Sequence, residues 1–196
     1  MPDLLVIAAV PTRFDNGMFA VLAILAVALA MSALVTYLFG TRQGSTSGLA
    51  VFVGKSARPL AAAIACVAML GSLYYSEVRH FEPCRWCWYQ RICWYPLAVI
   101  LVISVIRKDP NVRRYAWPMA TVGLVIASYH HVIERYPDLA DESSCSAIVP
   151  CSSPYFRVWG QFTIAAMSVM GLVSILVLLL IDRSWSRRQA DSKEHV

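Results

Sequence analysis

The chain has 196 residues, of which 58% are hydrophobic and only 15% are charged. This composition excludes an ordinary soluble domain of this size and predicts an all-α membrane protein. The net charge of +5 does not indicate a nucleic-acid-binding protein, because the basic residues gather in short segments that flank apolar runs.

The first apolar run covers residues 18–39 and contains no charged residue. At about 1.5 Å per residue it is long enough to cross a hydrocarbon core of about 30 Å. A cleaved signal peptide is the alternative, because small residues such as Ala28, Ala30 and Ala33 could form a cleavage site. The run is too long for a typical signal core, so we expect a retained helix.

Residues 40–58 are rich in Gly and Ser and contain three basic residues, which predicts a polar loop. Four further apolar runs predict membrane spans at residues 59–78, 88–106, 116–133 and 161–181. We therefore expect a four-helix transmembrane bundle over residues 58–183 with one additional N-terminal transmembrane helix. The remaining segments are an N-terminal segment of residues 1–57, which contains that helix, and a basic tail of residues 184–196.

The distribution of basic residues predicts the orientation of the chain in a cell membrane. Residues 40–58, residues 107–114 and the C-terminal segment from Arg183 onward together hold 11 of the 17 Lys and Arg residues. Positively charged short loops remain in the cytoplasm. We therefore expect the C-terminus in the cytoplasm and both cysteine-bearing loops outside it. A cleaved signal would reverse this arrangement and contradict the charge rule.

The first cysteine-bearing loop leads into the span at 88–106 with the sequence EPCRWCWYQR, residues 82–91. Cys84 and Cys87 have the spacing of an easily exchanged disulfide, and the helix dipole would favour a thiolate at Cys87. A helix that begins near Pro83 would place Cys84, Cys87 and Arg91 on one face. A cation one turn into a membrane costs about 2.5–3.5 kcal/mol, so Arg91 is expected to serve function.

A second cysteine pair, Cys145 and Cys151, lies in the loop of residues 136–159, where prolines and serines argue against a regular helix. Four cysteines in two extracytoplasmic loops predict two disulfides. Two alternatives remain: a non-enzymatic membrane scaffold with structural disulfides, and a metal-binding protein. The five-residue spacer and the nearby Arg91 fit a dication poorly.

The first pair and its surroundings suit a particular electron acceptor. A thiolate at Cys87, Arg91 one turn deeper and neighbouring aromatic side chains fit a molecule that is planar, lipid-soluble and negatively charged on reduction. A quinone has these properties, and Arg91 would stabilise the charge that develops on its oxygen. The second pair would pass oxidising equivalents to a soluble dithiol partner through mixed disulfides.

The chain also resembles a known family. The motifs that carry the resemblance are PCRWCWYQR at residues 83–91, Tyr129-His130, the pair Cys145 and Cys151, and WGQFTI at residues 159–164. Together they resemble the DsbB family of disulfide bond formation proteins, especially its BdbC-like branch, over about residues 58–183. The resemblance implies a four-helix bundle that reoxidises a thioredoxin-like, DsbA-type dithiol oxidase and passes the electrons to ubiquinone or menaquinone.

The resemblance also implies roles for individual residues. Cys145 would form the mixed disulfide with the partner, and Cys151 would exchange with Cys84. Cys87 would be the sulfur next to the quinone, and Arg91 would assist it. The residues expected to line the quinone site are Cys87, Arg91, Gln90 and His130, with no metal among the site groups.

Three features of the sequence depart from this pattern. The span at 18–39 has no counterpart in the four-helix core, and Ala165 stands where the branch often has proline. The five-residue spacer of the second cysteine pair suits the short-loop branch and leaves less reach for rearrangement than a long loop would. The vitamin K epoxide reductase-like family performs similar chemistry. In that family the loop cysteines precede the Cys-x2-Cys motif, whereas here they follow it.

Overall fold

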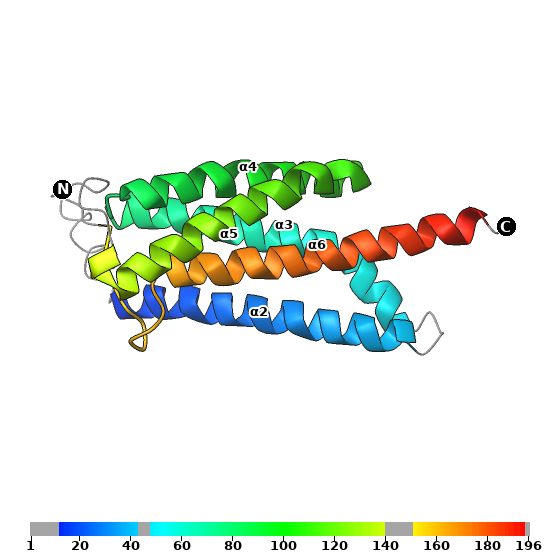
Figure 1. Cartoon of the computed structure of the whole chain (residues 1–196), viewed down its shortest axis with the longest axis horizontal. Coiled ribbons are helices and arrows are strands. Elements are labelled where there is room, and N and C mark those ends of the chain that lie inside the picture. The colour runs from blue at the N-terminus through cyan, green and yellow to red at the C-terminus, as the bar shows by residue number, and fades with distance from the viewer. Residues whose placement is uncertain (1–11, 43–47, 140–150, 195–196) are drawn as a thin grey trace, which may run out of the picture.

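The computed structural model describes residues 12–42, 48–139 and 151–194, and in Figure 1 its long helices run along a common direction. The long helices are α2 (Thr12–Arg42), α3 (Gly48–Leu73), α4 (Arg85–Arg107), α5 (Arg113–Arg135) and α6 (Ile164–Glu194). Three short helical turns are η1 (Tyr74–Val78), η2 (Pro110–Val112) and η3 (Pro137–Leu139). The prediction of an all-α bundle with an additional N-terminal helix is confirmed.

Four helical segments of the described chain are long and apolar enough to cross a membrane. They are Phe14–Gly40, Gly48–Val78, Arg85–Arg107 and Ile164–Asp191. Helix α5 has 23 residues, as many as α4, but is not among these four segments, because polar side chains such as His130 and His131 lower its hydropathy. The chain is a multi-pass membrane protein.

Helix α6 lies at the centre of the bundle, where it packs against α2, α3 and α5. Its neighbour α3 presents small residues, and Ala57, Ala61 and Ala65 are fully buried. A Cβ atom added at Gly54 would lie 2.5 Å from Cδ2 of Trp185, so this crossing requires glycine. Small residues at such contacts let membrane helices approach closely.

Helix α3 begins at Gly48, well before Pro59. The prediction of a polar loop over residues 40–58 was therefore wrong for residues 40–42, which end α2, and for residues 48–58, and residues 43–47 lie outside the described residues. Pro59 has no backbone N–H, and its ring clashes with the preceding turn. In a membrane helix this bends the helix without ending it. In Figure 1 the first turns of α3 run at a steep angle to the rest of the helix.

An ion cluster joins α3, α5 and α6 at the end of the bundle away from the start of α4. The Arg58 guanidinium lies 2.9 Å from the buried Asp182 carboxylate, and the Arg113 guanidinium lies 3.3 Å from it. Arg58 also donates to the backbone oxygen of Asp109 (3.0 Å). The charge of Arg58, which suggested a loop, is thus held inside the bundle.

Candidate thiol–disulfide site

The first cysteine pair forms the beginning of α4. Cys84 is the N-cap residue, and its sulfur accepts a hydrogen bond from the backbone N–H of Cys87 (3.3 Å). The Sγ atoms of Cys84 and Cys87 lie 2.8 Å apart, and both cysteines are free thiols. This helix start agrees with the one predicted near Pro83 and leaves the two sulfurs close enough to form a disulfide after a small rotation.

The structure stabilises a thiolate at Cys84. The sequence analysis had instead expected the helix dipole to stabilise one at Cys87. The hydrogen bond from the Cys87 thiol is the largest cause, and His130 adds to it, so the pKa of the Cys84 thiol is held well below its usual value although burial opposes the shift. An N-cap sulfur receives the unpaired N–H of the first turn, whereas a sulfur one turn later does not.

His130 on α5 lies beside this pair. The Gln90 amide donates to Nδ1 of His130 (2.8 Å), and an accepting Nδ1 leaves the hydrogen of the neutral ring on Nε2. That Nε2 lies 3.7 Å from Sγ of Cys84. Both Gln90 and His130 are buried, so the hydrogen bonds between them hold the imidazole in one orientation.

Glu134 is a site residue that the sequence analysis missed. Its carboxylate lies 3.7 Å from Nε2 of His130 and accepts a hydrogen bond from the Thr163 hydroxyl (2.5 Å). The side chain is 5% exposed. The sequence signal that could have found it is its spacing of four residues from His130, which places both side chains on one face of a helix.

Cys151 is disulfide-bonded and buried, and it packs in a cluster with Cys84 and Ile133. The second loop is tied to the first, because the Tyr155 hydroxyl donates to the backbone oxygen of Glu82 (2.6 Å). The structure thus brings Cys151 to Cys84. Cys145 lies outside the described residues.

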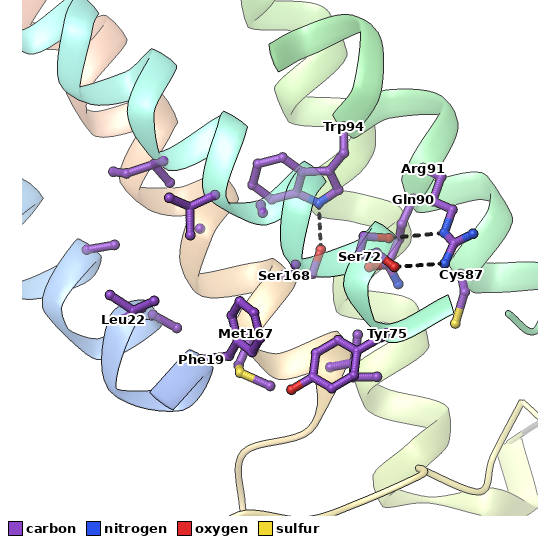
Figure 2. Close-up of a pocket in the computed structure, with 18 of the residues that line it drawn as sticks. Phe19, Leu22, Ser72, Tyr75, Cys87, Gln90, Arg91, Trp94, Met167 and Ser168 are labelled. Atoms are coloured by element: carbon purple, nitrogen blue, oxygen red, sulfur yellow. Dashed lines mark hydrogen bonds between the residues drawn. The ribbon is translucent and has the colours of Figure 1, made fainter. Parts of the chain in front are cut away.

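A cavity of about 330 Å³ opens beside Cys87. Figure 2 shows Cys87, Gln90 and Arg91 on one side of it, with Phe19 and Leu22 of α2 across from them. The remaining lining is mostly apolar and comes from α2, α3, α4 and α6, with further residues from η1 and the two cysteine-bearing loops. Cys87, Gln90 and Arg91 line this cavity as predicted, whereas His130 does not. It borders a smaller recess with Cys84, Cys87 and Cys151.

Arg91 is held at the wall of the cavity without a carboxylate partner among the described residues. Its guanidinium donates to the hydroxyl of Ser72 (3.0 Å) and to the backbone oxygen of Ser72 (3.2 Å). It also lies over the ring of Trp88, 5.3 Å from the ring centroid. The positive charge is positioned by neutral groups and remains available to an anionic or electron-rich ligand.

A metal ion is the alternative for the same cysteines. The ligand atoms of Cys84, Cys87 and His130 all lie within 4.8 Å of one another. Two thiolates on a tetrahedral zinc with bonds of about 2.3 Å would stand about 3.8 Å apart. The observed Sγ separation of 2.8 Å is shorter and fits a dithiol or disulfide better.

Fold and site together define a helical membrane protein that carries a thiol–disulfide site beside an apolar cavity. A family model described as Disulfide bond formation protein DsbB matches residues 55–181, more than half of the chain. The chain belongs to the DsbB family and is a membrane disulfide-generating oxidoreductase.

Curated relatives agree with this assignment. The chain is 39% identical over 118 residues to Disulfide bond formation protein C of Bacillus subtilis (strain 168), which covers 60% of this chain and 86% of that protein. It is 40% identical over 145 residues to a Probable disulfide formation protein of Deinococcus radiodurans, which covers 69% of this chain and 91% of that protein. No solved structure matches the chain.

Proposed function

We propose that the chain is a thiol:quinone oxidoreductase that reoxidises an extracytoplasmic, thioredoxin-like DsbA-type protein. The observation that carries this proposal is that Cys87 and Arg91 line one apolar cavity. A redox sulfur and an unpaired cation then face the same ligand. Ubiquinone and menaquinone are the expected electron acceptors.

The cavity fits a quinone in size and chemistry. Its volume of about 330 Å³ lies at the lower end of the range for small-molecule sites, and its walls are largely apolar. Arg91 would hydrogen-bond a quinone oxygen and stabilise negative charge on it. A quinone bound there would accept two electrons and two protons and leave as a quinol.

The electrons would come from the Cys84–Cys87 dithiol, whose two sulfurs lie between the second cysteine pair and the cavity. Cys87 borders the large cavity, and Cys84 borders the recess that also contains Cys151. Oxidation of the Cys84–Cys87 dithiol forms one S–S bond and releases two electrons and two protons. The Nε2–H of His130 is placed to donate to the Cys84 thiolate and stabilise it, and Gln90 orients the ring.

The second pair would connect this dithiol to the partner. A partner thiolate would attack Cys145 of a Cys145–Cys151 disulfide, and the second partner thiol would then displace Cys145, which leaves an oxidised partner and a reduced loop pair. The Cys151 thiolate would next attack Cys84 of the Cys84–Cys87 disulfide and release Cys87 as a thiolate. Cys145 would then attack Cys151 and release Cys84, which restores the loop disulfide and leaves the Cys84–Cys87 dithiol reduced. The packing of Cys151 against Cys84 supports this step.

The orientation in the membrane forms part of the proposal. Both cysteine-bearing loops would face the extracytoplasmic side, and the C-terminus would lie in the cytoplasm. This requires α5 to cross the membrane, which its length and its packing against α4 and α6 support. The cluster of Arg58, Arg113 and Asp182 would then lie at the cytoplasmic end.

The test is quinone-dependent oxidation of a reduced thioredoxin-like protein by the purified chain. We expect Cys87→Ala and Cys145→Ala each to abolish oxidation. Cys66→Ala, which alters a free cysteine outside both pockets, should retain it. Equal activity in all variants would reduce the cysteine pairs to structural disulfides. Stoichiometric metal in the purified protein, with thiols released by a chelator, would support the metal-binding alternative instead.

A further inference from the structure

Helix α2 precedes the residues that the family model matches, yet it forms one wall of the cavity. The family match begins at residue 55, whereas α2 covers Thr12–Arg42. The helix packs against α3 and α6, and Figure 1 shows it running alongside α6. An element added to the family core therefore borders the site that the core provides.

The side of α2 that faces the cavity is entirely apolar. Its lining residues are Phe19, Leu22, Ala23, Leu25, Ala26 and Leu29. Phe19 and Leu29 are ten residues apart, which corresponds to about 15 Å along a helix axis. The cavity is thus elongated, and only its end near Cys87 and Arg91 carries the polar groups of the redox site.

The wall opposite α2 is apolar over the same length. Helix α3 contributes Leu60, Ala63, Ile64, Val67 and Ala68 to it. The head of a quinone needs only the end that contains Arg91. The remaining length matches the chemistry of an isoprenoid tail, which is apolar and extended.

A polar cluster fixes the start of α2 at the level of the redox site. The Tyr74 hydroxyl donates to the Asp15 carboxylate (2.7 Å), and the Tyr75 hydroxyl donates to the Asn16 side-chain oxygen (3.0 Å). The Arg79 guanidinium lies 3.6 Å from the Asp15 carboxylate. Both tyrosines belong to the π-helical turn η1, a distortion often found at functional sites.

Packing reinforces these polar contacts. A Cβ atom at Gly71 would lie 2.9 Å from Cε1 of Phe19, so glycine lets this ring enter between the helices. The Phe19 ring also contacts the rings of Tyr74 and Tyr75, whose centroids lie 6.0 Å and 5.3 Å from its own. Since Ser72, which holds Arg91, follows Gly71 directly, the position of α2 is linked to that of the cation.

We propose that α2 is a specificity wall that binds the isoprenoid tail of the quinone against α3. The inference rests on the proposed thiol:quinone activity and assigns the tail subsite to residues that the family core lacks. Ala26 lies midway along the wall, where a larger side chain would fill the space of the tail and leave the redox end open.

The test compares an isoprenoid-tailed ubiquinone with the same ring lacking a tail. In Ala26→Phe we expect KM for the tailed quinone to rise about tenfold, because the lost apolar contact corresponds to about two methylene groups. KM for the tail-less ring should stay within about twofold of wild type. Ala28→Phe, an exposed residue outside the cavity lining, is the matched control and should change neither value.

A second readout does not depend on turnover. In Ala26→Cys, tailed quinone should slow alkylation of the new thiol by a membrane-permeable maleimide, and tail-less quinone should not. Ala28→Cys should be alkylated equally under all conditions. Equal effects of the two quinones at position 26, in either readout, would overturn the inference. A wild-type protein that reduces neither quinone would overturn the proposed activity itself.

Discussion

The imidazole Nε2 of His130 lies 3.7 Å from Sγ of Cys84, and this contact joins α5 to the first turn of α4. It places a titratable ring beside the sulfur that also packs against Cys151. The two cysteines of the first pair therefore differ in surroundings: Cys84 faces the second pair, and Cys87 borders the cavity. In the proposed reaction, this asymmetry would give the electrons a direction through the site.

The lowered pKa of Cys84 predicts a reactive thiolate in the reduced protein below the usual thiol pKa of about 8.5. Since the folded pKa is lowered, the thiolate stabilises the reduced fold above the usual thiol pKa, and this contribution is lost as the pH falls through the lowered value. The pKa of Cys84 is measured from the rate at which its thiol is alkylated as a function of pH, followed on the peptide that contains Cys84. Trypsin cleaves after Arg85 and so separates Cys84 from Cys87.

In the same measurement His130→Ala should move the alkylation midpoint of Cys84 to higher pH, because the hydrogen bond and charge of the imidazole are removed. His131→Ala, the neighbouring and more exposed histidine, is the matched control and should leave the midpoint in place. An unchanged midpoint in His130→Ala would show that this ring does not stabilise the thiolate.

Glu134→Gln tests the carboxylate behind His130. The amide keeps the size of the side chain and removes the negative charge 3.7 Å from Nε2. We expect kcat for thiol oxidation to fall about tenfold, because the carboxylate positions the imidazole that stabilises the Cys84 thiolate, while KM for quinone stays constant. Glu77→Gln, on the exposed surface, serves as control. A rise in KM alone would assign Glu134 to ligand binding instead.

Arg91→Gln should lower kcat/KM for quinone about 100-fold, the usual cost of removing one charge-stabilising donor. Arg91→Lys should recover only part of the loss, because an ammonium group cannot hold both Ser72 oxygens and a ligand as the planar guanidinium can. The exposed Arg85 lies in the same first turns of α4, so Arg85→Gln controls for a general loss of positive charge. Equal losses in both glutamine variants would remove the special role of Arg91.

Asp182→Ala should destabilise the bundle by about 3–5 kcal/mol, because it leaves two partly buried guanidinium groups without their carboxylate. Unfolding in mixed detergent micelles measures the free energy. Asp191→Ala, an exposed carboxylate on the same helix, should change it by less than about 0.5 kcal/mol. A comparably small effect at Asp182 would show that the cluster contributes little to stability.

Several parts of this picture follow from local sequence. Long uncharged runs require helices in a membrane, and the Cys-x2-Cys spacing with Arg91 seven residues after Cys84 fixes one helical face. The helices and the shared cavity of Cys87 and Arg91 were predictable on this basis.

Other parts depend on contacts between distant segments. Residues 48–58 are helical because α6 supplies Asp182 for Arg58 and Trp185 for Gly54, neither of which is visible in the local pattern. Glu134, one turn after His130 on α5, is fixed in the site by the distant Thr163, whose hydroxyl donates to its carboxylate. No property of residues 18–39 alone indicates that α2 borders the cavity.

The most direct test of the account isolates the first cysteine pair. A Cys145→Ala/Cys151→Ala variant, reduced and then mixed anaerobically with a short-tailed ubiquinone, should form one quinol per protein molecule together with a Cys84–Cys87 disulfide. The same variant with Cys87→Ala added should form none. Absence of quinol in the first case, or equal quinol in both, would contradict electron transfer from this dithiol to a quinone.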